Sequence, residues 1–220
     1  MNTILERVNL ACKSVRDVNK RGVTFKKLVV STRSNFKNQK FDLSLKTKKD
    51  KSLEPFQFYV NAYYDGEDDF NNETPIEVIV HHNFGDTSVF NEIQITDFLI
   101  QIFDATVHEY RHQIQSVARN YQVYSSHEQS PYHDYLSDPD ELDAYAFSIA
   151  VELLRHMPRE RAKKYLTRIK ILAKMRIDTL LVSPNLKAYI DHFDLCPMTK
   201  KLAKKIYTHL DSIDRVHIFM

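Results

Sequence analysis

Glycine is scarce in this sequence. The 220 residues include three glycines, Gly22, Gly66 and Gly85, which lie far apart. A loop that cradles the phosphates of a nucleotide needs several glycines within a few residues. The sequence therefore argues against a nucleotide site of the glycine-rich kind.

Cysteine is also scarce, and long apolar runs are missing. Cys12 and Cys196 form no C-x-x-C pair, so we expect reduced thiols rather than a disulfide. The first residues lack the apolar run of a signal peptide, and no stretch reaches the roughly 18 apolar residues of a membrane helix. We therefore expect no membrane partner, and a cytoplasmic protein or one packed into a particle assembled there.

The charge of the chain is nearly balanced. Lysine and arginine number 31 and aspartate and glutamate 29, which gives a net charge of +2 at pH 7. Basic residues gather near 158–176 and 198–206, but apolar residues alternate with them at helical spacing, as in a packed helix with a solvated face. Nucleic acid is therefore not among the partners that we expect.

The apolar pattern predicts a sheet in the first half of the chain. Residues 2–19 carry apolar residues at helical spacing, which predicts a helix. The stretch 37–51 is rich in lysine and is expected to form a solvated hairpin at the sheet edge. Short β-type runs are separated by polar turns and lie at 23–25, 27–30, 41–45, 56–60 and 76–80.

The second half of the chain is expected to be helical. Thr96 can cap a long helix that ends near Arg119, with Asp97 in its first turn. Asp138 and Pro139 can open a second long helix, since proline suits the first helical position. Two further helices are expected, at 158–176 and 198–214.

These patterns predict an α+β fold in a single domain over 1–220. A small, mainly antiparallel sheet in 1–95 is expected to pack on the long helix, and helices fill 96–220. Hydrophobic residues make up 43% of the chain, which is enough for a folded core.

The long helix carries a potential metal site in the segment 108–112. His108 and His112 are four residues apart, so both imidazoles can reach one metal ion from the same face of a helix. Glu109 lies about 100° further round the helix, where its carboxylate can reach a water molecule at the metal. This is the H-E-x-x-H pattern of two zinc ligands and a general base.

A catalytic zinc takes a third protein ligand, and Glu141 is the best candidate. It stands three residues after Asp138, so its carboxylate could instead close a capping box at the start of the second helix. Because the histidine pair needs a third ligand to complete a metal site, we favour metal binding over helix capping for Glu141. Asp140 and Asp143 are the alternative ligands, or partners that orient a ligand histidine.

The two segments together resemble the gluzincin class of zinc metallopeptidases. That class carries H-E-x-x-H on one helix and E-x-x-A or E-x-x-D on a second, and Glu141 and Ala144 match the second element. The stretch 96–155 looks like zincins encoded in the genomes of phages and large viruses. The resemblance implies a zincin-like fold, one Zn²⁺ per chain and a polypeptide substrate. It also suggests that the strand in 76–84 binds extended substrate by β-addition.

The function that follows is zinc-dependent peptide-bond hydrolysis. His108, His112 and Glu141 would hold Zn²⁺, and Glu109 would act as the general base. The alternative is a non-catalytic zincin-fold protein with a structural or interaction role, in a virion and with other virion or phage proteins as partners. The donor that stabilises the oxyanion is left open among the tyrosines and histidines of 120–137 and Tyr145.

Overall fold

The structure is a computed structural model that describes residues 2–66, 74–121, 132–168, 182–193, 197–215 and 218–219. The chain divides into an N-terminal unit, residues 1–122 with 219–220, and a C-terminal unit, residues 123–218. The boundary between the units lies shortly after the end of helix Glu92–Ala118, which carries the histidine pair. The prediction of a single domain stays a prediction.

The elements of the N-terminal unit are α1 (Asn2–Asn19), β1 (Val23–Thr24), α2 (Phe25–Asn38), β2 (Leu43–Lys49), β3 (Phe58–Tyr63), β4 (Ile76–His82), β5 (Val89–Phe90) and α3 (Glu92–Ala118). Those of the C-terminal unit are α4 (Tyr132–Ser137), α5 (Pro139–His156), α6 (Arg159–Thr167), α8 (Pro184–Phe193) and α9 (Pro197–Ser212). The mixture of helices with a small sheet confirms the α and β content that was predicted.

The main sheet has three strands in the order β2-β4-β3. Strand β4 pairs antiparallel with β3 and parallel with β2, while β1 and β5 form a separate antiparallel pair. The hairpin expected in 37–51 is therefore wrong, because β4 inserts between β2 and β3. The lysines of β2 do lie exposed on an edge strand, as expected.

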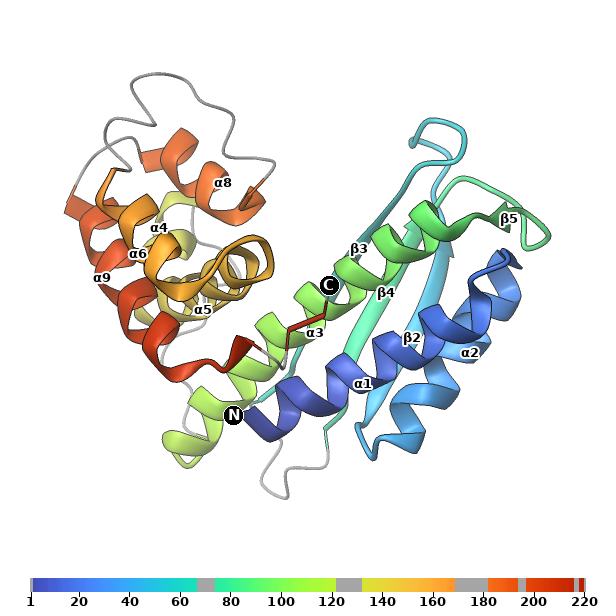
Figure 1. Cartoon of the computed structure of the whole chain (residues 1–220), viewed down its shortest axis with the longest axis horizontal. Helices are drawn as coiled ribbons and strands as arrows, with labels where there is room; N and C mark the ends of the chain where they lie inside the picture. Colours follow the sequence, from blue (N-terminus) through green and yellow to red (C-terminus); the bar gives the residue numbers. More distant parts are fainter. Residues whose placement is uncertain are drawn as a thin grey trace. The chain divides into compact units, whose positions relative to one another are not determined.

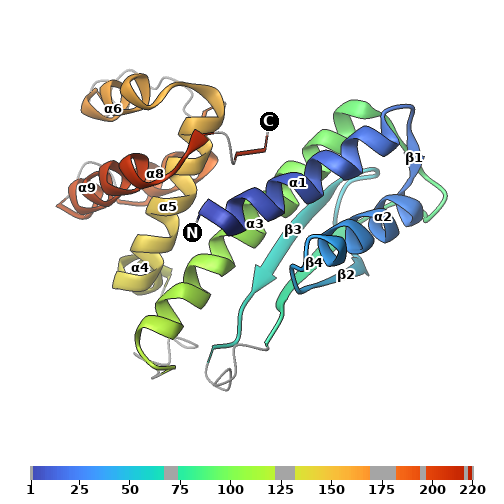
Figure 2. The same cartoon turned by 60° about the horizontal axis from the view of Figure 1, so that its bottom comes forward.

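One face of this sheet is buried and the other is exposed. Alternate residues of β2 and β4 point inward, and Leu45, Val78 and Val80 are buried there. Helices α2 and α3 lie along the sheet, and α1 packs against both of these helices (Figures 1 and 2). The core of the N-terminal unit therefore lies between the sheet and its helices, and α3 is held along its length.

The run 27–30, expected to be a strand, lies inside helix α2. The buried residues of α2 recur at helical spacing, namely Phe25, Leu28, Val29, Thr32 and Phe36. Four consecutive apolar residues do not distinguish the two-residue period of a strand from the 3.6-residue period of a helix, whereas the whole stretch does. The helix is also tied to the sheet edge, since the Arg33 guanidinium donates two hydrogen bonds to the Leu45 carbonyl, at 2.8 and 2.6 Å.

The residue that caps helix α3 lies five residues before Thr96, which was the expected cap. Asn91 caps the helix and forms a capping box with Gln94, with both hydrogen bonds at 3.0 Å. Thr96 lies inside the helix and donates to the Glu92 carbonyl at 2.8 Å. The predicted end near Arg119 is confirmed, because the last helical residue is Ala118.

Helix α5 is the centre of the C-terminal unit. The predicted cap at Asp138 and the first position at Pro139 are confirmed. From Leu142 to Leu154 most residues are buried, and α4, α6, α8 and α9 all pack on α5. Only 159–167 of the helix expected over 158–176 is seen, and 169–176 lie outside the described residues.

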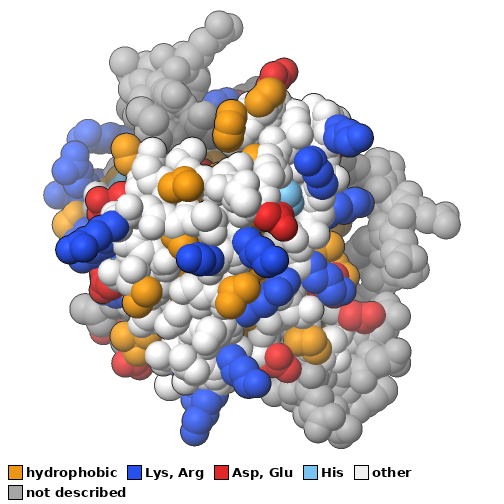
Figure 3. Space-filling view, turned by 90° about the vertical axis from the view of Figure 1, so that its right-hand side faces the viewer, with side chains coloured by type: hydrophobic (Ala, Val, Ile, Leu, Met, Phe, Trp, Pro, Cys, Tyr) orange, Lys and Arg blue, Asp and Glu red, His pale blue; other side chains and the backbone are white. Residues whose placement is uncertain are grey.

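The face of the molecule in Figure 3 carries side chains of both charges. On the face in Figure 3, Lys and Arg side chains are interspersed with acidic and hydrophobic ones rather than gathered into one basic patch. Within the described ranges, none of the helices is both long enough and apolar enough to cross a membrane. Cys12 is buried in the N-terminal unit, and Cys196 lies outside the described residues.

Candidate metal centre

The two histidines of α3 converge on one point. Their Nε2 atoms lie 3.3 Å apart, and the ring planes are inclined by 74°. Two nitrogens that are each about 2.0–2.1 Å from a tetrahedral zinc are separated by about 3.3–3.4 Å. The pair of His108 and His112 therefore has the nitrogen separation of a zinc site, as the spacing of four residues predicted.

His112 is oriented by a neighbour that the sequence analysis did not single out. Its Nδ1 lies 2.9 Å from the Gln115 Oε1, and Gln115 is largely buried. Since an amide oxygen only accepts, Nδ1 carries the proton in this contact and the Nε2 lone pair is left for a metal. The spacing of three residues was a signal, because residues three apart share a helix face.

Glu141 lies in the first turn of α5, where Asp138 caps the helix by itself. The Asp138 carboxylate accepts from the backbone N–H groups of Asp140 at 2.8 Å and Glu141 at 3.3 Å. A capping box would need the Asp138 N–H for the Glu141 carboxylate, but this group donates to the Tyr135 carbonyl at 3.1 Å. Capping therefore does not need the Glu141 side chain.

His108, His112 and Glu141 form a group that could hold a metal ion. Each offers one ligand atom, and the three atoms lie within 4.8 Å of one another. Two imidazoles and one carboxylate are a donor set that suits zinc and also iron. The residues therefore fit the predicted metal site, and the identity of the metal remains a prediction.

Of the two alternative ligands, Asp143 has its carboxylate engaged in other contacts. Asp143 Oδ1 lies 3.1 Å from both the Lys205 Nζ and the His209 Nε2, all within the C-terminal unit. These contacts assign Asp143 to the packing of α5 on α9 rather than to the third ligand position. Asp140 contributes its backbone N–H to the helix cap.

The role predicted for the strand in 76–84 is wrong. Strand β4 is the middle strand and is hydrogen-bonded along both sides, so it has no edge for an added peptide. Its histidines point to opposite faces, as expected: His82 is buried, and His81 stacks on Tyr59 with a centroid distance of 4.6 Å. Strand order depends on long-range pairing, which the local pattern does not show.

The candidate oxyanion donors remain undecided. Tyr124 and His127 lie outside the described residues, as do the side chains of Tyr132 and His133. Tyr145 packs on the Tyr189 ring, with a centroid distance of 5.2 Å. Glu109 is half-buried on α3, directly after His108 in the chain, and its role as general base stays a prediction.

Comparisons with family models, with curated proteins and with solved structures find no match to this chain. The resemblance to gluzincins therefore rests on the motif residues, and the zincin-like fold remains a prediction.

Proposed function

We propose that this chain is a zinc-dependent peptidase. The observation that carries the proposal is the 3.3 Å separation of the His108 and His112 Nε2 atoms, which matches the spacing of two ligands on one tetrahedral ion. His108, His112 and Glu141 would hold the metal. Bound there, Zn²⁺ supplies a Lewis acid that polarises a carbonyl and lowers the pKa of a water molecule toward about 7.

The protein's own residues would do the remaining work. Gln115 keeps the His112 ring in the tautomer that presents Nε2. Glu109 takes the proton from the attacking water and passes it to the leaving amine. The apolar helix around them, with Phe103 and Val107 buried, limits access of bulk water from that side of α3.

An extended polypeptide substrate would add to β3. Within the described residues, β3 pairs only with β4, and α3 packs against β3. The outer edge of β3 therefore offers backbone hydrogen-bonding groups beside the helix that carries the histidine pair. This edge takes the role that the sequence analysis gave to 76–84.

The first experiment is the metal content of the purified protein, measured by elemental mass spectrometry. We expect about one zinc per chain, and a loss of zinc in His112→Ala and in Glu141→Ala, because three ligands are needed to hold the ion firmly. Glu92→Ala, on the exposed first turn of α3, is the matched control and should keep the metal.

The outcomes separate the parts of the proposal. No zinc in the wild type after zinc is supplied and the excess removed would overturn the site. Zinc lost in His112→Ala but kept in Glu141→Ala would remove Glu141 from the ligand set. Zinc held by all three ligands without hydrolysis of unfolded protein substrates would favour the non-catalytic alternative.

A further inference from the structure

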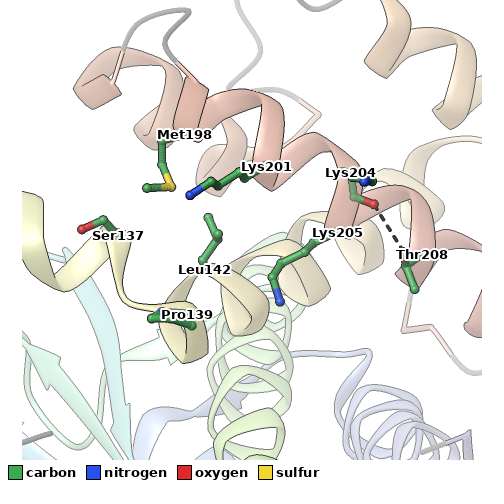
Figure 4. A pocket seen from close by; sticks show the side chains of 8 residues that line it. All are labelled: Ser137, Pro139, Leu142, Met198, Lys201, Lys204, Lys205 and Thr208. Atoms are coloured by element: carbon green, nitrogen blue, oxygen red, sulfur yellow. Dashed lines mark hydrogen bonds between the residues drawn. The ribbon is translucent and has the colours of Figure 1, made fainter. Parts of the chain in front are cut away.

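A second candidate site lies wholly within the C-terminal unit, between the start of α5 and the outer face of α9. It is an open cavity of about 440 Å³. Its apolar part is formed by Pro139 and Leu142 of α5 and Met198 of α9, and Figure 4 shows Leu142 and Met198 facing the space between the two helices. Small-molecule pockets have volumes of about 300–1,000 Å³, so the cavity can hold a ligand.

Three lysines line the same cavity. Lys204 and Lys205 stand three and four residues after Lys201, so all three lie on the same side of α9 (Figure 4). Lys205 lies 3.1 Å from the Asp143 carboxylate, which balances part of its charge. Lys201 and Lys204 have no ion-pair partner in the described part of the chain, where no carboxylate lines the cavity.

The two halves of the lining select one kind of ligand. An apolar body gains free energy from the surface that it buries against Leu142, Met198 and the lysine stems. An anionic group gains charge-assisted hydrogen bonds from the ammonium groups. A neutral apolar molecule would contact only the apolar residues of the lining, and an inorganic anion would contact only the lysines.

We propose that this cavity binds a small amphipathic anion. Its carboxylate or phosphate group contacts Lys201 and Lys204, and its apolar chain or ring lies against Leu142 and Met198. This site is independent of the proposed peptidase function, because none of the three metal-binding candidates lines the cavity.

The test is calorimetric titration of the full chain with octyl phosphate and with octanoate, both below micelle formation. Octanol and inorganic phosphate are the two comparison ligands. We expect at least one amphipathic anion to bind at least tenfold more tightly than either of them, because only it uses both halves of the lining. The tighter of the two anions identifies the headgroup. Equal binding of octanol, or no saturable binding of either anion, overturns the proposal.

Two neighbouring lysines give a matched pair of variants. Lys201 lines the cavity, whereas Lys200 is exposed on the same helix and does not line it. We expect Lys201→Gln to weaken binding of the anion by about three- to tenfold and Lys200→Gln to leave it unchanged. Equal weakening by both would show a general effect of surface charge and would overturn the proposal. The zinc content is measured separately on the same samples, so failure of one site leaves the other tested.

Discussion

The chain carries two closely spaced pairs of histidines that behave in opposite ways. His81 and His82 are neighbours on β4, so their side chains lie on opposite faces of the sheet. His108 and His112 are four residues apart on α3, and their Nε2 atoms lie 3.3 Å apart. Two histidines therefore converge when their spacing matches the period of the element that carries them, about four residues in a helix. Closeness in the sequence alone does not bring their side chains together.

The surroundings of the two pairs also differ. His82 is 5% exposed and packs among phenylalanine rings, with ring centroids 4.7 Å from both Phe25 and Phe84. Burial lowers the pKa of His82 below its ordinary value, so the ring stays neutral. The pair on α3 is half-buried, and its nitrogens face each other. His82 therefore belongs to the core, whereas the α3 pair has the geometry of residues that could hold a metal ion.

The largest expected effect separates catalysis from metal binding on α3. Glu109→Gln should lower peptide hydrolysis by about 10²- to 10⁴-fold and keep the metal, because the amide cannot take a proton. Glu92→Gln, on the first turn of the same helix, should leave both unchanged. The rate is measured on an unfolded protein substrate and the zinc by elemental analysis. A hydrolysis rate in the Glu109→Gln variant equal to that of the wild type would contradict the proposed mechanism.

Features set by neighbouring residues were predicted correctly from the sequence. The cap at Asp138 and Pro139 and the convergence of His108 with His112 depend on side chains within one turn of a helix. Gln115 could have been found by the same reasoning, since it lies three residues after His112.

Two features that depend on distant residues were not predicted, namely the order of the strands and the helical state of 27–30. The central place of β4 depends on its pairing with both β2 and β3, and the run Leu28 to Val30 gave too few residues to distinguish a strand from helix α2. Glu141 was predicted as the third ligand and joins the histidines in the group. Because it lies on a different helix from them, that prediction rested on the resemblance to a two-helix motif rather than on spacing along one helix. Its role is therefore tested by its own variant.

The second effect tests the assignment of His82 to the core. His82→Ala should destabilise the fold by about 2–4 kcal/mol, because it leaves a cavity among the surrounding rings. His81→Ala should cost about 1 kcal/mol or less, because that ring stacks on Tyr59 at the exposed face rather than filling the core. Neither variant should change the zinc content. Denaturant unfolding gives both values, and equal costs for the two variants would contradict the assignment.

The third effect tests whether Gln115 orients His112 for metal binding. Gln115→Leu removes the acceptor at the His112 Nδ1, and we expect zinc affinity to fall by about 10- to 100-fold. Gln101→Leu is the matched control on the same helix, since its amide contacts Asp97 rather than a histidine. Competition with a chromophoric chelator measures the affinity. Unchanged affinity in the Gln115→Leu variant would remove Gln115 from the site.

The smallest effect concerns the pH dependence of stability and rests on the lowered pKa of His82. The unfolded state binds the His82 proton at a higher pH than the folded state does, so stability rises with pH in this range. The contribution of His82 to the free energy of unfolding is fully present above about pH 6.5 and is lost as the pH falls through the folded pKa. The free energy of unfolding changes through this group by no more than about 1.4 kcal/mol per pH unit. His82→Phe keeps an aromatic ring beside Phe25 and Phe84 but cannot bind a proton, so its stability should fall less below pH 6.5. Denaturant unfolding of both proteins, with metal removed by a chelator, gives the difference between the two curves. That difference isolates His82 from the other histidines, which are the same in both proteins. Parallel curves would show that His82 is protonated equally in the folded and unfolded states.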